Sequence, residues 1–259
     1  MTKSPRSLSA GAAIVAFCDV DDSLITTARV SPCEGAEPCA VDNAGRICGF
    51  LSPKQRMLNQ LLASSAQVVL TTARSSRSLS NLNLPVSGGY AIVSFGGVIL
   101  TPDGKPVPAW HKHMERAAAL YASLLEEGCN QIKEAARARN IDVRVRVVID
   151  AGLPLYVSVK HNQRNLAELS IIKEVAEAFI SPLAPSLDVH CNGNFLALLP
   201  RFLRKEYAVK WFMENLATPG ALTIGLGDSV SDLPFMSLCD YLLMPGSSQV
   251  FTSIYPTSE

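Results

Sequence analysis

Three short apolar runs, each followed at once by polar residues, form the main pattern of this chain. They cover residues 12–18, 67–70 and 221–226. Short runs that are almost wholly apolar are typical of parallel strands buried on both faces of a sheet. Because the carboxyl ends of parallel strands meet at one edge, we expect the polar residues after the three runs to lie together there.

Segments with helical periodicity separate these runs. They cover residues 53–63, which begin with a proline, residues 203–216 and residues 232–238. Two more strands are predicted at residues 90–95 and 241–244. Strands that alternate with helices predict an α/β fold, here a Rossmann-like open parallel sheet.

The middle of the chain has a different character. A proline-rich turn begins at Thr101. After it the pattern predicts helices at residues 112–139 and 166–179, and hairpin strands at 143–149, 155–159, 187–191 and 195–199. We therefore expect a core domain of residues 1–100 and 200–259, interrupted by an α+β cap domain of residues 101–199.

Composition narrows the classes of partner and compartment. The 23 lysines and arginines balance the 23 aspartates and glutamates, so nothing predicts a nucleic acid or an anionic membrane as partner. No apolar run reaches the length of a membrane span. The seven scattered cysteines favour a reducing compartment, and Cys33, Cys39 and Cys48 lack the paired spacing of a zinc site. A soluble, cytoplasmic protein is the expectation.

Two carboxylates follow the first apolar run. Asp19 and Asp21 are two residues apart, so an extended backbone directs both side chains the same way. One carboxylate can attack a phosphorus atom, while the other protonates the leaving alcohol and then deprotonates water. The pair predicts a phosphate monoester hydrolase that passes through an aspartyl-phosphate.

Two more carboxylates, Asp228 and Asp232, follow the third run. Several carboxylates facing a phosphate dianion would repel it, and a divalent cation relieves this repulsion. Magnesium takes oxygen ligands and bridges carboxylates to phosphate. The acids therefore predict a Mg²⁺ cofactor.

A phosphoryl group in transfer also needs hydrogen-bond donors and a positive charge. Thr72 supplies a hydroxyl after the second run. Lys205 begins a helix-like segment before the third run and is the best-placed cation, with Arg204 and Lys210 as rivals by position.

In order along the chain, four motifs resemble those of the haloacid dehalogenase-like (HAD) hydrolases. Residues 19–24 resemble the first motif, Asp-x-Asp-Gly-Thr, and residues 72–74 resemble the second, Thr-Gly-Arg. Residues 205–209 resemble the third, Lys-Gly-x-Ala-Leu, and residues 227–232 the fourth, Gly-Asp-Ser followed by a second Asp. The resemblance covers nearly the whole chain. Within the family it is to the phosphatases with a C2-type cap, the type IIB group that includes Cof-like and sucrose-phosphate phosphatases.

This resemblance implies a role for each matched residue. Asp19 is implied as nucleophile and Asp21 as acid/base, and Thr72 and Lys205 as phosphate ligands. The implied ligands of the magnesium ion are Asp19, Asp21 through its backbone carbonyl, Asp228 and Asp232.

Four positions depart from the family pattern. Asp22 and Ser23 stand for the usual Gly and Thr, and Ala73 and Glu206 each stand for Gly. We interpret Asp22 as the cap of a turn. A pair between Glu206 and Lys205 would weaken the lysine as a phosphate ligand.

The cap is expected to select the substrate, a small phosphorylated molecule. Its candidate contacts are Lys160, His161, Asn192 and Asn194, and the core contributes Arg74. The amide side chains favour a sugar phosphate, with a phosphorylated cofactor precursor or a nucleotide as alternatives. The segment 26–51 is longer than a usual connection and is interpreted as a loop that gates the site or is mobile.

Other functions stay open on the sequence. A phosphomutase would use the same groups and return the phosphoryl group to its sugar, and a catalytically silent protein would bind a phosphorylated ligand without turnover. A dehalogenase is disfavoured because cleavage of a carbon-halogen bond needs neither Asp21 nor a metal.

Overall fold

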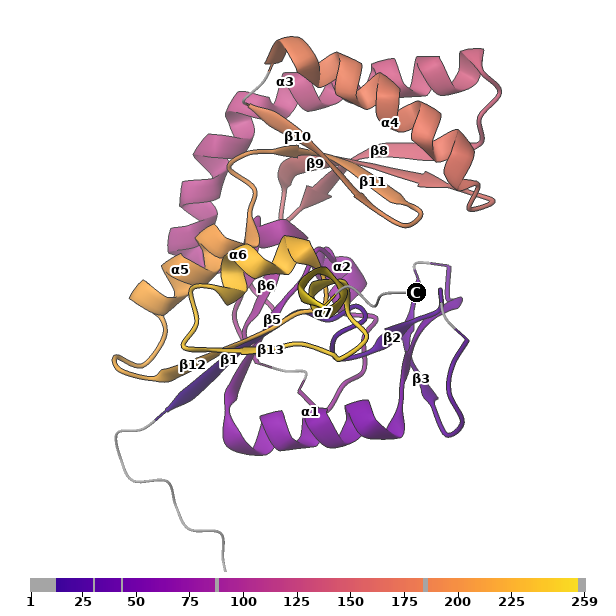
Figure 1. The fold of residues 1–259 in the computed structure, drawn as a ribbon. Coiled ribbons are helices and arrows are strands. Elements are labelled where there is room, and N and C mark those ends of the chain that lie inside the picture. The colour runs from indigo at the N-terminus through magenta and orange to yellow at the C-terminus, as the bar shows by residue number, and fades with distance from the viewer. Residues whose placement is uncertain (1–12, 30, 43, 87–88, 184–185, 256–259) are drawn as a thin grey trace, which may run out of the picture. The chain divides into compact units, whose positions relative to one another are not determined.

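The structure, a computed structural model, describes residues 13–29, 31–42, 44–86, 89–183 and 186–255. The N-terminal segment of residues 1–11, and Ala12 at the predicted start of the first strand, lie outside these residues. The chain divides into two compact units: unit 1 consists of Met1–Lys105 and Lys205–Glu259, and unit 2 of Pro106–Arg204 (Figure 1). Each unit is described by itself below.

Unit 1 is built on a six-stranded sheet with the strand order β13-β12-β1-β5-β6-β7. The strands are β1 Ile14–Cys18, β5 Gln67–Thr71, β6 Ala91–Val93, β7 Val98–Leu100, β12 Leu222–Leu226 and β13 Tyr241–Leu243. Neighbouring strands are parallel except for β7, which runs antiparallel to β6. This open, mainly parallel sheet confirms the predicted α/β fold class.

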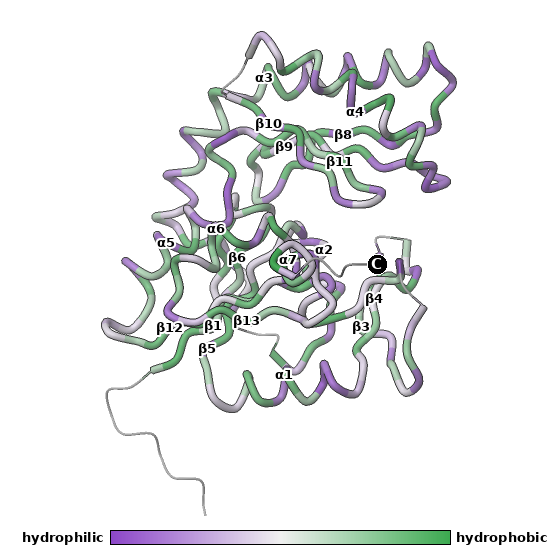
Figure 2. The backbone as a smooth tube through the Cα atoms, in the orientation of Figure 1, coloured by the Kyte–Doolittle hydropathy of each residue, from purple (hydrophilic) through white to green (hydrophobic). Residues whose placement is uncertain are grey.

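The central strand β1 is buried because its residues are apolar throughout. Every residue of β1 after Ile14 is buried, and Figure 2 shows β1 and β12 in hydrophobic colours. Aromatic rings fill the space beside β1, where Phe17 packs edge-on against Phe212 with 5.6 Å between ring centroids. Burial of such a pair is a large hydrophobic contribution to the core of unit 1.

Unit 1 has five α-helices and two 3-10 helices among its described residues. They are α1 Pro53–Ser65, α2 Ser76–Leu79, α5 Lys205–Asn215, α6 Leu233–Met236 and α7 Gln249–Ile254, with the 3-10 helices η1 Ser94–Gly96 and η3 Val230–Asp232. In α1 the Ser52 side chain accepts a hydrogen bond from the backbone N–H of Gln55, and the Gln55 side chain accepts one from the N–H of Ser52. This capping box, together with Pro53 in the first turn, explains why the helix starts there.

Two predicted elements of unit 1 are shorter than expected. The strand predicted over residues 90–95 ends at Val93, because Ser94 and Phe95 adopt φ values of 51° and 57° and form the turn η1 instead. The helix predicted over residues 232–238 is the pair η3 and α6, with Pro234 in the first turn of α6. Both changes lie at the edge where the candidate residues gather.

The segment 26–51 is not a loop, which corrects the sequence prediction. It contains β2 Thr26–Thr27, β3 Glu37–Val41 and β4 Ile47–Leu51, which form an antiparallel sheet in the order β2-β4-β3. Pairing between these strands therefore satisfies backbone polar groups of β2, β3 and β4.

Unit 2 is a four-stranded antiparallel sheet with the order β10-β11-β9-β8, accompanied by two long helices. Its elements are α3 Pro108–Ala138, β8 Val143–Asp150, β9 Leu153–His161, α4 Leu166–Ile180, the 3-10 helix η2 Ser181–Leu183, β10 Leu187–Asn192 and β11 Phe195–Pro200. The β8–β9 hairpin turns through Ala151 and Gly152, both at positive φ.

One face of the unit 2 sheet packs on the helices. The cluster of buried residues includes Leu125 and Ile132 of α3, Ile172 of α4, and Val157 and Leu198 of the sheet. The tube of α3 alternates between hydrophilic and hydrophobic residues in Figure 2, as expected for a helix with one buried face. Unit 2 thus has a hydrophobic core of its own.

Among the described residues, none of the helices has the length and hydrophobicity needed to cross a lipid bilayer.

Candidate active site

The carboxyl ends of β1, β5 and β12 meet at one edge of the unit 1 sheet. In the strand register Cys18 lies beside Leu70 of β5 and Leu226 of β12. The backbone N–H of Asp19 continues the ladder by donating to the Leu226 carbonyl at 2.8 Å. The residues that follow the three strands therefore start from neighbouring positions, as parallel pairing requires.

Asp19 and Lys205 form a buried ion pair at this edge. The Lys205 Nζ lies 2.7 Å from Asp19 Oδ1 and 2.7 Å from Asp232 Oδ1. Burial alone would lower the pKa of Lys205, but the two carboxylates more than offset it and raise that pKa above its usual value. The lysine is thus a fixed positive charge between two acids. Of the three candidate cations it is the one at this edge, since Arg204 pairs with Asp188 in unit 2 and Lys210 is exposed.

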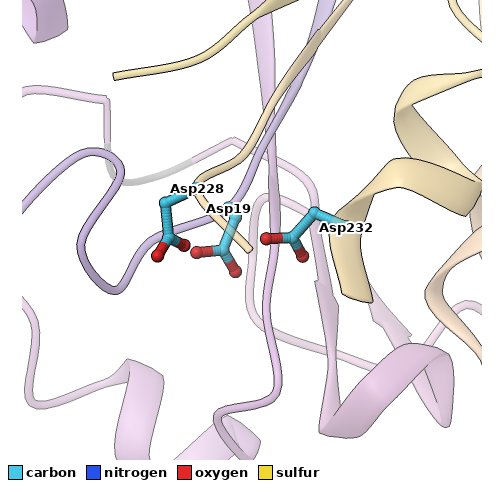
Figure 3. A group of neighbouring side chains, drawn as sticks. All are labelled: Asp19, Asp228 and Asp232. Atoms are coloured by element: carbon cyan, nitrogen blue, oxygen red, sulfur yellow. The ribbon is translucent and has the colours of Figure 1, made fainter. Parts of the chain in front are cut away.

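Three carboxylates converge beside this lysine. Asp19, Asp228 and Asp232 each offer an oxygen atom, and these oxygens all lie within 4.8 Å of one another (Figure 3). Asp19 and Asp232 are 6% and 1% exposed. Burial, with further contributions from Asp232 and Asp22, raises the pKa of Asp228 to about 6. Burial likewise raises the pKa of Asp19, although Lys205 counteracts this effect.

This donor set suits a divalent cation with a preference for oxygen. Three acids share one lysine, so the ionised cluster carries an excess of negative charge in a mostly buried position. A bound cation would offset this negative charge and favour the ionised form of the acids. The residues present therefore fit a magnesium ion.

Local structure holds Asp232 in place. Its Oδ2 accepts hydrogen bonds from the backbone N–H and the hydroxyl of Ser229, at 3.1 and 2.7 Å. Gly227 makes this close approach feasible, because a Cβ atom there would lie 2.6 Å from the Cβ of Asp232. The Gly-Asp-Ser sequence of residues 227–229 thus supplies Asp228 and, through Gly227 and Ser229, positions Asp232.

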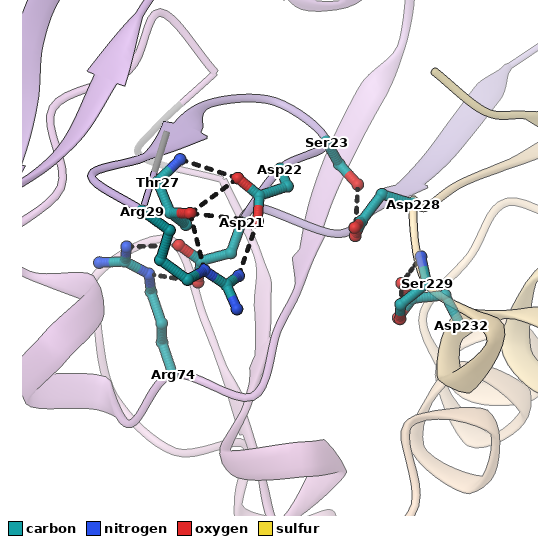
Figure 4. A network of polar contacts seen from close by, with 9 residues as sticks. All are labelled: Asp21, Asp22, Ser23, Thr27, Arg29, Arg74, Asp228, Ser229 and Asp232. Atoms are coloured by element: carbon teal, nitrogen blue, oxygen red, sulfur yellow. Dashed lines mark hydrogen bonds and ion pairs between the residues drawn. The ribbon is translucent and has the colours of Figure 1, made fainter. Parts of the chain in front are cut away.

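Asp21 has a partner that the sequence did not indicate. Arg74 Nε and Nη2 donate to its two carboxylate oxygens at 2.9 and 2.7 Å (Figure 4). Burial would lower the pKa of Arg74, and the pairing with Asp21 more than offsets this. The guanidinium side chain is 10% exposed and committed to Asp21. In this structure Arg74 therefore contacts Asp21, and its contact with substrate stays a prediction.

The turn after β1 is held by Asp22. This residue has φ 62°, a left-handed backbone conformation that residues other than glycine adopt at a cost in free energy. Its carboxylate accepts hydrogen bonds from the backbone N–H and the hydroxyl of Thr27, both at 2.8 Å, and pairs with Arg29 at 2.6 Å (Figure 4). The interpretation of Asp22 as a turn cap is confirmed.

Thr72 and Ser23 complete the polar edge. Thr72 is 1% exposed, and its hydroxyl oxygen accepts a hydrogen bond from the backbone N–H of Arg74 at 3.1 Å. The hydroxyl hydrogen of Thr72 can still be donated to a ligand. The Ser23 hydroxyl donates to Asp228 at 3.4 Å. Thr72 is the first residue after β5, and Ser23 lies in the turn that follows β1.

The cap candidates lie in unit 2. His161 is 3% exposed, its Nε2 contacts Glu168 at 2.8 Å and its Nδ1 accepts from the Gln163 N–H, and its contact with substrate stays a prediction. Asn194 donates to the His161 carbonyl at 2.8 Å. Lys160 is exposed and lies over an aromatic ring of β11. Asn192 is the last residue of β10 and pairs with Phe195, the first residue of β11.

The sequence analysis did not identify Thr27 and Arg29 as partners of Asp22. Neither belongs to one of the four motifs, and their contacts with Asp22 depend on how the chain turns after β1. The signal available in the sequence was Arg29, an arginine seven residues after Asp22, which stands where the family has glycine. Among the described residues the carboxylate partners of Lys205 are Asp19 and Asp232. The ion pair between Glu206 and Lys205 that the sequence suggested is not formed there.

Comparisons with known proteins identify the fold. No protein-family model matches the sequence, and no curated protein matches it. Among solved structures, the sucrose-phosphatase of Synechocystis, in complex with sucrose and phosphate, aligns over 96% of this chain and 88% of its own, with a TM-score of 0.53 and 15% identity.

Two further structures give similar results. The C-terminal domain of the trehalose-6-phosphate phosphatase of C. albicans has a TM-score of 0.56 and 14% identity, covering 88% of this chain and 73% of its own. A haloacid dehalogenase-like hydrolase from Bacteroides thetaiotaomicron has a TM-score of 0.50 and 14% identity, covering 94% of this chain and 100% of its own. At these identities the likeness concerns the fold: this chain has the fold of the HAD phosphatases.

Proposed function

We propose that this chain is a magnesium-dependent phosphate monoester hydrolase that forms an aspartyl-phosphate on Asp19. One observation carries the proposal: the buried Asp19 carboxylate contacts Lys205 at 2.7 Å and shares a cluster of oxygens with Asp228 and Asp232. A nucleophile, a fixed cation and two further acids are the groups that phosphoryl transfer requires.

In the first step an Asp19 oxygen attacks the phosphorus atom, and the bond between phosphorus and the ester oxygen breaks. The proton that the leaving alcohol needs comes from the carboxyl of Asp21, one of whose oxygens must part from Arg74 to carry it. Lys205 and the hydroxyl of Thr72 stabilise the charge on the phosphoryl oxygens. The product is the acyl-phosphate on Asp19.

In the second step the Asp21 carboxylate removes a proton from water, and this water attacks the phosphorus atom. Phosphate leaves and the Asp19 carboxylate is restored. Arg74, bidentate on Asp21, holds this carboxylate in one orientation. Asp19, Asp228, Asp232 and the backbone carbonyl of Asp21 would hold a magnesium ion, whose positive charge would offset the repulsion between these acids and the phosphate.

A small phosphorylated metabolite, most favourably a sugar phosphate, is the proposed substrate. Support comes from the solved structures with the same fold, whose names include a sucrose-phosphatase and a trehalose-6-phosphate phosphatase. Lys160, Asn192 and Asn194 are the proposed contacts in the cap, which we take to be unit 2. His161 is left out because both of its ring nitrogens are engaged.

The proposal is tested by measuring phosphate release from sugar phosphates, nucleotides and p-nitrophenyl phosphate, with magnesium or with EDTA. We expect release that needs magnesium, that falls at least about a thousandfold in Asp19→Asn and that falls about a hundredfold or more in Asp21→Asn. Asp42→Asn, in an exposed turn of unit 1, is the control and should keep wild-type activity.

Wild-type release no greater than that of Asp19→Asn on every compound would contradict the proposal. Binding without turnover would then identify a silent phosphate-binding protein. Isomerisation of a sugar phosphate without net release would instead identify a mutase.

A further inference from the structure

The turn after β1 carries one acid more than the family motif that it resembles. Asp22 stands where that motif has glycine. Both of its neighbours in the chain belong to the candidate site: Asp21 is the proposed acid/base, and Ser23 donates a hydrogen bond to Asp228 at 3.4 Å. The additional carboxylate therefore lies between two residues of the site.

A further negative charge at this place has opposite effects on the two ligands of the proposed reaction. It attracts a divalent cation that binds at the acids, and it repels a phosphate dianion. The charge of Asp22 does act on the acid cluster: burial and Asp232 raise the pKa of Asp228, and Asp22 raises it further. An uncompensated Asp22 would thus favour the metal ion and disfavour the phosphorylated substrate.

Arg29 forms an ion pair with this additional acid. Its Nη2 atom lies 2.6 Å from Asp22 Oδ2 (Figure 4). Its Nε donates to the Thr27 hydroxyl at 3.0 Å, and the same hydroxyl donates to Asp22 Oδ1 at 2.8 Å. Thr27 thus holds both members of the ion pair. This matters because the side chains of Arg29 and Asp22 are 38% and 28% exposed, and a partly exposed ion pair that nothing fixes has little effect.

Basic side chains compensate most acids of the site. The first and fourth motifs, residues 19–24 and 227–232, contain five acids. Among the described residues, basic partners are found for four of them: Lys205 for Asp19 and Asp232, Arg74 for Asp21, and Arg29 for Asp22. In the same part of the chain no basic side chain forms an ion pair with Asp228, the fifth acid. With Arg29 in place, the uncompensated charge lies at the proposed metal ligand Asp228 and not at Asp22.

We propose that Arg29 is a positioning residue that holds the Asp22 carboxylate against Thr27 and cancels its charge, so that one site binds both the metal ion and the phosphorylated substrate. The inference rests on the proposed function, because it concerns the same site. Arg29 acts through Asp22 and needs no contact with the substrate.

Calorimetric titration of the full chain tests this role without turnover. Mg²⁺ is titrated first, and inorganic phosphate is then titrated at saturating Mg²⁺. Arg29→Gln keeps a hydrogen-bond donor and loses the charge, so we expect it to bind Mg²⁺ about fivefold more tightly and phosphate about fivefold more weakly. Arg29→Lys keeps the charge and should bind both ligands as the wild type does. Arg46→Gln, which breaks the exposed ion pair with Asp42 in the small sheet, is the matched control and should change neither affinity.

Opposite shifts for the two ligands separate compensation of charge from loss of structure, because a disordered turn would weaken both. Asp22→Asn leaves Arg29 uncompensated, so it should weaken Mg²⁺ binding and strengthen phosphate binding. Asp22→Asn/Arg29→Gln should restore the wild-type affinities. If Arg29→Gln does not fold, Asp22→Asn alone decides through these reversed shifts. In the phosphate assay, Arg29→Gln should raise KM severalfold and leave kcat within about twofold of the wild type.

Unchanged Mg²⁺ affinity in a folded Arg29→Gln protein, or weaker binding of both ligands, would overturn the role of Arg29. Magnesium-dependent phosphate release by the wild type would then still support the hydrolase. Conversely, opposite shifts in Arg29→Gln together with no phosphate release by the wild type would support the role of Arg29 and contradict the hydrolase.

Discussion

Residues close in space but far apart in sequence set the chemistry of the candidate site. Asp21 and Arg74 are 53 positions apart, and Lys205 and Asp19 are 186 positions apart. Motif spacing placed the acids and the lysine at one sheet edge, because strand ends are predictable from apolar runs. It did not predict the ion pair between Arg74 and Asp21, because that contact depends on side-chain geometry in the folded chain.

Asp22 illustrates how one residue can replace a glycine. Its left-handed backbone costs about 1 kcal/mol, and hydrogen bonds to Thr27 and Arg29 offset this cost. We expect Asp22→Ala to lower the free energy of unfolding by about 2 kcal/mol, because it keeps the strained φ and loses the bonds. Asp22→Asn, which can still accept from Thr27, should lose less, and Asp22→Gly should be intermediate.

Urea denaturation of the three Asp22 variants measures these differences. An Asp22→Ala protein as stable as Asp22→Asn would show that the hydrogen bonds to Thr27 contribute nothing.

Elements with strong periodicity were predicted well, and short ones were not. The strands β1, β5 and β12 and the helix α1 appear within a few residues of their predicted ranges. β3 and β4 were missed because Pro38 and Gly49 interrupt them and their burial does not alternate cleanly. Such strands are stabilised by their pairing with each other more than by local propensity.

The junction between β12 and the short helices η3 and α6 depends on close packing. A Cβ atom at Gly227 would lie 2.6 Å from the Asp232 Cβ and 2.9 Å from the Met236 Sδ. We expect Gly227→Ala to destabilise the protein by about 2 to 4 kcal/mol and to reduce phosphate release more than tenfold, because Asp232 must move.

Thermal denaturation and the phosphate assay together check the effect of Gly227→Ala. Gly246→Ala is the matched control, since a Cβ at Gly246 would meet nothing within 4 Å. Wild-type stability and activity in Gly227→Ala would refute the role of this contact.

For the molecule as a whole, the acid cluster links stability to pH. The pKa of Asp228 is raised to about 6 from 3.8, so the folded state binds this proton more tightly than the unfolded state. The contribution of Asp228 to stability is therefore greatest below pH 3.8 and is lost as the pH rises through 6. We expect Asp228→Asn to raise the free energy of unfolding in EDTA at pH 7 by about 1 to 3 kcal/mol.

Denaturation curves between pH 4 and pH 8 test this dependence. The gain from Asp228→Asn should shrink towards pH 4, and magnesium should stabilise the wild type more than the variant. A gain that does not change with pH would contradict the raised pKa as its cause.

The order of β-strands in unit 1 has a consequence for how the chain folds during synthesis. β1 pairs with β12, whose residues are made about two hundred positions later. Because unit 2 is one continuous segment with its own buried cluster, it has all its partners before β12 leaves the ribosome. Contacts between such distant residues form slowly. The two acids after β12 therefore reach Asp19 late, and a nascent chain acquires its candidate catalytic centre among the last parts of the fold.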